Sequence, residues 1–105
     1  MGDDWIIRDC EEYLQSVAQC GGQRTVDEAL APIERGLSRN PEGFHKTALR
    51  DIYIARTDIR WVGREIVLAH RLWFRIEVRE RAVTLLWIES IRPEDIGDDD
   101  DEIPF

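Results

Sequence analysis

The chain has 105 residues, enough for one domain with its own core, and 43 % of them are apolar, which excludes wholesale disorder. No apolar stretch approaches the roughly 20 residues that a membrane-spanning helix needs. Residues 1–7 also lack the basic and then apolar order of a secretory signal. We therefore expect a cytoplasmic protein that does not use a membrane.

The net charge of −8 is distributed unevenly along the chain. Residues 1–34 carry eight acidic and two basic side chains, whereas residues 35–81 carry ten arginines and one lysine against six acids. Residues 94–105 add seven acids and no base. A basic middle between acidic ends suits an anionic partner such as RNA. A solvated surface of mixed charge with a disordered acidic tail explains the same pattern equally well.

The cysteines and histidines do not form a recognisable metal-binding pattern. Cys10 and Cys20 are ten residues apart, and only His45 and His70 could join them as ligands. Because a structural metal site usually needs three or four converging ligands, we expect no metal and no cofactor. Two unpaired thiols also suit a reducing compartment.

The N-terminal third predicts two helices. Apolar residues recur every three or four positions through residues 3–20, and Gly21 and Gly22 then end the first helix. The stretch from Thr25 to Glu28 has the pattern of a capping box, so a second helix is expected from there to Asn40, with a break at Pro32. Two helices joined by a short glycine link predict an antiparallel helical hairpin.

Extended structure is expected after residue 44. Candidate strands cover residues 49–57, 61–69, 71–78 and 82–88, and the last two are joined by a short link that favours a β-hairpin. The sequence therefore predicts an α+β fold, with the helical hairpin packed on three or four antiparallel strands. Residues 1–93 form the single domain, and residues 94–105 form an acidic tail that we expect to be disordered.

The arginines of the third candidate strand are the strongest chemical signal. Arg71, Arg75 and Arg79 are spaced evenly, which places them on the sheet face that also carries Trp73 and Glu77. Arginines beside an aromatic ring suit phosphate contact and base stacking. Alternatively, these arginines form ion pairs across the strands. His70 points to the other face in a regular strand, so we expect it to have a structural role.

Three stretches resemble the RelE/ParE toxin superfamily of bacterial type II toxin–antitoxin systems. Residues 29–44, ALAPIERGLSRNPEGF, resemble the family's second helix and its Asn-Pro turn. Residues 70–76, HRLWFRI, and residues 81–92, RAVTLLWIESIR, resemble two of its strands. The resemblance covers about residues 25–93. It implies a toxin that is held by a cognate antitoxin protein.

The resemblance also implies an activity and its residues. In ribosome-dependent members, a strand arginine and an arginine after the last strand act on messenger RNA without a metal, and these positions match Arg71 and Arg92. Arg56, Arg75 and Trp73 are the expected substrate contacts of such an mRNA interferase. The acidic segment after Pro93 departs from the family pattern, so other interpretations stay open. They are a protein-binding member that inhibits DNA gyrase, a silent relative, and an unrelated small α+β scaffold.

Overall fold

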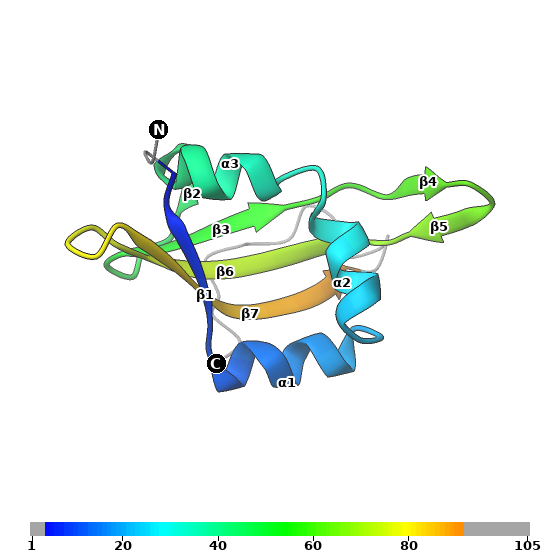
Figure 1. The fold of residues 1–105 in the computed structure, drawn as a ribbon. Helices are drawn as coiled ribbons and strands as arrows, with labels where there is room; N and C mark the ends of the chain where they lie inside the picture. The colour runs from blue at the N-terminus through cyan, green and yellow to red at the C-terminus, as the bar shows by residue number, and fades with distance from the viewer. Residues whose placement is uncertain (1–3, 92–105) are drawn as a thin grey trace.

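The computed structural model describes residues 4–91, apart from the side chains at positions 60, 62 and 65. A five-stranded sheet carries three helices on one face, and a separate two-stranded hairpin projects beyond it (Figure 1). This arrangement confirms the predicted α+β class. Within the described part, no helix has the length and apolar character needed to cross a membrane.

The sheet is mostly antiparallel, with the strand order β1-β7-β6-β3-β2. Only the pairing of β1 with β7 is parallel among the described strands. Two outer strands that the sequence did not predict, β1 and β2, bring the count to five. The strands and helices along the chain are β1 (Ile6–Asp9), α1 (Glu11–Gln19), α2 (Gln23–Leu30), α3 (Glu34–Arg39), the 3₁₀ turn η1 (Pro41–Gly43), β2 (His45–Lys46), β3 (Ile52–Arg56), β4 (Arg60–Val62), β5 (Glu65–Val67), β6 (Ala69–Glu77) and β7 (Ala82–Ile91).

The first helix begins later than the sequence pattern indicated. Residues 6–9 form β1, and Ile6 lies opposite Ala82 of β7. The backbone amide of Ile6 also donates to the carbonyl of Arg81 at 2.9 Å. The expectation of one helix through residues 3–20 was therefore wrong for residues 6–9, because pairing with β7 satisfies their backbone better than an isolated helical turn.

The second predicted helix is divided into α2 and α3, as the proline indicated. Residues 31–33 form a turn, in which the amide of Ile33 donates to the carbonyl of Leu30 at 2.9 Å. The start of α2 differs from the prediction, because Gly22 caps it and no side chain does. The Thr25 hydroxyl contacts the carbonyl of Gly21 at 3.5 Å, so this residue lies inside the helix instead of forming a capping box.

The predicted strand over residues 61–69 is a hairpin with its turn at Gly63, not one strand. Gly63 has a φ of +64°, a left-handed conformation that reverses the chain between β4 and β5. The predicted hairpin of the last two strands is confirmed, although β7 continues to Ile91. A register shift between Trp73 and Phe74 adds a bulge to this pairing.

Two groups of buried side chains lie on the two faces of the sheet. The larger group joins Tyr13 of α1, Val26 of α2 and Leu37 of α3 to the inner residues of β6 and β7. The smaller group lies on the opposite face and consists of Ile52, Ile54, Trp73 and Leu86. Because side chains alternate along each strand, neighbouring residues belong to these two separate groups on opposite faces of the sheet.

Candidate functional site

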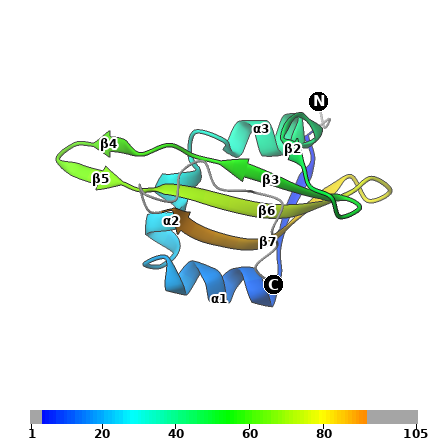
Figure 2. The same cartoon turned by 180° about the vertical axis from the view of Figure 1, so that it is seen from behind.

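The predicted substrate contacts on β3 and β6 share one face of the sheet by register, the face that carries Ile52, Ile54 and Trp73 and not the core under the helices. Figure 2 shows the fold from behind, with β3, β6 and β7 side by side. Register pairs Arg56 with Arg71, Ile54 with Trp73, and Ile52 with Arg75. Residues that are directly opposite each other in a sheet point to the same side. We call Arg56, Arg71, Trp73 and Arg75 the arginine face.

The members of the arginine face differ in their exposure. Arg56 and Arg75 are exposed, whereas the Arg71 side chain is only 13 % exposed. Its Nε lies 3.9 Å from Oε1 of Glu89, which is opposite it on β7. Trp73 is 1 % exposed, and its indole nitrogen has no hydrogen-bond partner within the described residues. Arg71 and Trp73 thus form a buried centre between two exposed cations.

The remaining predicted residues lie elsewhere. Arg79 is in the turn after β6 and is exposed, so it does not continue the strand as its spacing indicated. Arg92 lies outside the described residues. The interpretation by cross-strand ion pairs holds for Arg71, which lies opposite Glu89 of β7. Glu77 lies instead 3.8 Å from the guanidinium of Arg8 in β1 and accepts a hydrogen bond from Thr84.

Two residues on this face were not singled out as site residues from the sequence. Glu89 becomes relevant only when the register of β6 and β7 brings it opposite Arg71. His45 lies opposite Ile54 and therefore shares the face, but it belongs to a strand of two residues that has no period to detect. The sequence signal that could have identified Glu89 is its position just after residues 82–88, a strand expected to pair with the strand that carries Arg71 and Arg75.

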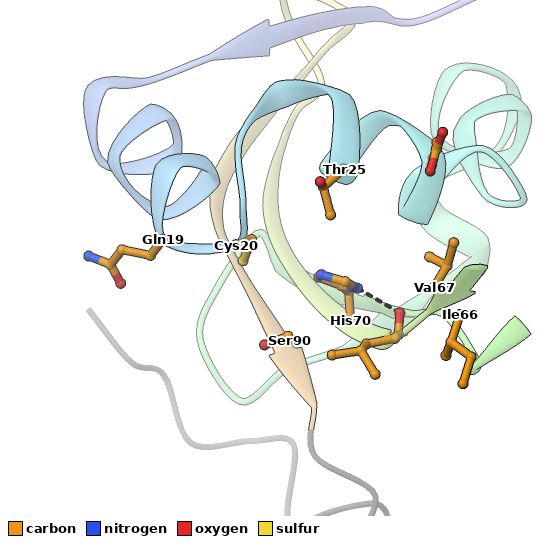
Figure 3. Close-up of a pocket in the computed structure, with 9 residues that line it drawn as sticks. Gln19, Cys20, Thr25, Ile66, Val67, His70 and Ser90 are labelled. Atoms are coloured by element: carbon orange, nitrogen blue, oxygen red, sulfur yellow. Dashed lines mark hydrogen bonds between the residues drawn. The ribbon is translucent and has the colours of Figure 1, made fainter. Parts of the chain in front are cut away.

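His70 lies on the helical side and lines a cavity of about 280 Å³, shown in Figure 3. Its Nδ1 lies 2.8 Å from the carbonyl of Leu68, which assigns the proton to this nitrogen. The opposite nitrogen, Nε2, is buried and has no hydrogen-bond partner in the described part of the chain. Cys20, which caps the C-terminal end of α1, and Thr25 of α2 face the same cavity.

Burial controls the chemistry of this cavity. Loss of hydration lowers the pKa of His70, and the hydrogen bond to the Leu68 carbonyl only partly opposes this shift. Burial also raises the pKa of Cys20, so its thiol stays protonated and is a poor nucleophile. Among the described residues, no three His, Cys, Asp or Glu side chains gather as a metal site would require. The cavity therefore supports a structural role for His70.

Comparisons with known proteins give a fold. Neither the models of known families nor the sequences of curated proteins match this chain. A similar solved structure is the toxin–antitoxin complex RelBE2 from Mycobacterium tuberculosis. The similarity has a TM-score of 0.61 at 18 % identity and covers 87 % of this chain and 95 % of that one. The chain therefore has the RelE-like fold that its sequence resemblance implied.

Proposed function

We propose that this protein is the toxin component of a type II toxin–antitoxin pair and cleaves messenger RNA. The observation that carries the proposal is the arginine face. It combines three guanidinium groups and one indole on a single sheet surface of a RelE-like fold. Guanidinium groups are suited to phosphate contacts because they donate several hydrogen bonds in one plane. We further propose a cytoplasmic location and an antitoxin protein as partner.

In this mechanism the arginine face stabilises the negative charge that develops on the phosphate during cleavage. The RNA supplies its own nucleophile: a ribose 2′-hydroxyl loses its proton to water and attacks the adjacent phosphorus, which forms a 2′,3′-cyclic phosphate. The bond to the next nucleotide's 5′-oxygen breaks, and this oxygen takes a proton from water. Arg71 stabilises the additional negative charge on the phosphoryl oxygens, and Arg56 and Arg75 hold the flanking phosphates. Arg92 is proposed as the second catalytic arginine. Trp73 is proposed to stack on a base, which requires that its ring become accessible when RNA binds.

The test is cleavage of a defined messenger RNA in a translating extract. Arg71→Ala is expected to slow cleavage by about 100-fold or more, the usual loss when one charge-stabilising group is removed. Arg24→Ala is the matched control, because Arg24 is an exposed arginine of α2 on the helical side. Cleavage that is insensitive to Arg71→Ala would remove the interferase assignment.

A specific contact favours a second function, in which the protein acts by binding a protein target without cleaving RNA. Glu89 lies opposite Arg71 and offsets its charge, and Arg71 is mostly buried. An arginine that is paired with a carboxylate attracts phosphate weakly, but it can still contact a protein partner that docks on this face. Growth arrest after induced expression without cleavage of messenger RNA would favour this non-catalytic function, with DNA gyrase as one target to assay. No growth effect would favour a silent relative.

A further inference from the structure

The structural role of His70 uses only one of its two ring nitrogens. Nδ1 carries the ring proton, because it lies 2.8 Å from the Leu68 carbonyl. Nε2 is therefore an acceptor, and no donor within the described residues reaches it. The residue is only 2 % exposed. A buried polar atom normally has a partner, because an unsatisfied one has lost its hydration without compensation, so Nε2 points to a ligand.

The cavity that His70 lines has an exposed rim and a buried base. Thr25 and Ser90 are exposed at the rim, whereas Val67 and His70 are buried. Figure 3 shows the His70 ring among these side chains, with Nε2 on the opposite edge of the ring from the dashed hydrogen bond. A cavity of about 150 Å³ is large enough for benzene. The volume of about 280 Å³ therefore accommodates a six-membered ring with a polar substituent.

The lining combines hydrogen-bond acceptors with an apolar wall. Glu28 of α2 contributes a carboxylate and Ser90 of β7 a hydroxyl, and none of the described lining residues is a lysine or arginine. Ile66 and Val67 of β5 supply apolar surface. Burial lowers the pKa of His70, which keeps Nε2 an acceptor near neutral pH. This lining disfavours phosphates and carboxylates and suits a ligand that donates hydrogen bonds.

We propose that this cavity, here called the histidine cavity, is a binding site for a compact organic amine or amidine. The N–H groups of the ligand donate to Nε2 of His70 and to the carboxylate of Glu28, and its apolar body packs on Ile66 and Val67. The histidine cavity is separate from the arginine face, because His70 and Arg71 are neighbours in one strand and point to opposite sides. The inference therefore does not rest on the proposed toxin function.

The probe is benzamidine, which joins a flat apolar ring to a cationic group with several N–H donors. Benzoate is the matched control, because it has the same shape but is negatively charged and offers acceptors only. Each compound is titrated into the full-length protein, and amide chemical shifts are recorded. We expect benzamidine to bind with a Kd of about 1 mM, as suits so small a ligand, and benzoate to bind at least about tenfold more weakly. The shifted amides should include His70, Val67 and Thr25.

Two variants test the acceptors. His70→Phe keeps a flat ring and removes Nε2, so it should weaken benzamidine binding about tenfold or more. Glu28→Gln keeps the length of the side chain and removes its charge, so it should weaken binding about threefold. Glu12→Gln is the matched control and should bind like wild type, because Glu12 is an exposed residue of α1 outside the cavity. If His70→Phe does not fold, Glu28→Gln and the comparison with benzoate still test the proposal.

The outcomes distinguish a ligand site from a cavity that holds only water. Benzamidine shifts at the cavity that weaken in His70→Phe and Glu28→Gln, but not in Glu12→Gln, support the proposal. Equal binding of benzoate would overturn it, because the lining would then not select donors. Equal losses in Glu28→Gln and Glu12→Gln would reveal a mere effect of net charge and overturn it too. No binding to the wild-type protein would also reject it and leave ordered water as the partner of Nε2.

Discussion

At the scale of single residues, His70 and Arg71 are neighbours in β6 whose side chains point to opposite faces of the sheet. The His70 ring lines a cavity on the helical side of the sheet, whereas Arg71 belongs to the arginine face beside Glu89. The prediction that these neighbours point apart is therefore confirmed, because alternation of side chains is a local property of any strand. Their proposed roles can be altered independently by substitution.

The buried histidine should make stability depend on pH. The unfolded chain binds a proton on His70 near the ordinary pKa of about 6.5, whereas burial lowers the pKa in the folded state. The free energy of unfolding should therefore be highest above pH 6.5 and fall as the pH drops towards the native pKa. Urea unfolding between pH 7.5 and 5.5 measures this decline. His70→Gln should flatten it, and the exposed His45→Gln should not; equal slopes in all three proteins would contradict this account.

Ser16 connects the helical layer to the sheet through two hydrogen bonds. Its hydroxyl donates to the carbonyl of Tyr13 at 2.7 Å and accepts from the amide of Ile88 at 3.0 Å. Ser16→Ala should reduce the free energy of unfolding by about 1–3 kcal/mol, because a buried amide loses its partner. Ser38→Ala, which removes a partly exposed hydroxyl, should cost less than about 0.5 kcal/mol by the same urea measurement. Similar losses would show that the contact to Ile88 adds little.

At the scale of elements, local patterns predicted the long segments and missed the short ones. The alternation of residues 71–77 and the apolar run after Ala82 sufficed to predict the pairing of β6 with β7. By contrast, β1 and β2 have four and two residues, and they exist because β7 and β3 offer free edges. Such a short strand forms because a partner strand lies beside it in the fold, and a local stretch of sequence does not show that partner.

The β4–β5 hairpin should open independently of the rest of the fold. Val67 is its only buried side chain among those described, and Gly63 needs a positive φ. Gly63→Val should accelerate hydrogen exchange of the β4 and β5 amides about tenfold, because a β-branched residue is strained there by about 1–2 kcal/mol. Asn tolerates this conformation, so Gly63→Asn should stay near wild type. A large fall in the melting temperature of Gly63→Val would show that the hairpin unfolds with the core.

At the scale of the whole molecule, the opposing charges are placed on different surfaces. Asp9, Asp27 and Glu34 line one pocket on the helical side, and the arginine face lies on the other side of the sheet. Counting charges by segment indicated the separation, because the N-terminal elements are acidic and the central strands are basic. The sequence could not predict that Arg71 faces Glu89, since this contact depends on the register after a bulge.

The acidic tail, residues 94–105, gives this charge separation a testable consequence, although it lies outside the described residues. Removing it takes away seven negative charges and changes the net charge from −8 to −1. We expect this deletion to tighten binding of a uridine-rich RNA about tenfold at low salt, because carboxylates compete with phosphates for Arg56 and Arg75. Filter binding at two salt concentrations measures the effect, which should shrink as salt screens it. A control of equal length replaces the seven acids by Asn and Gln, and it should match the deletion. If the full chain binds RNA at low salt as tightly as both variants, the tail does not compete for the arginine face, and the buried centre around Arg71 alone limits access.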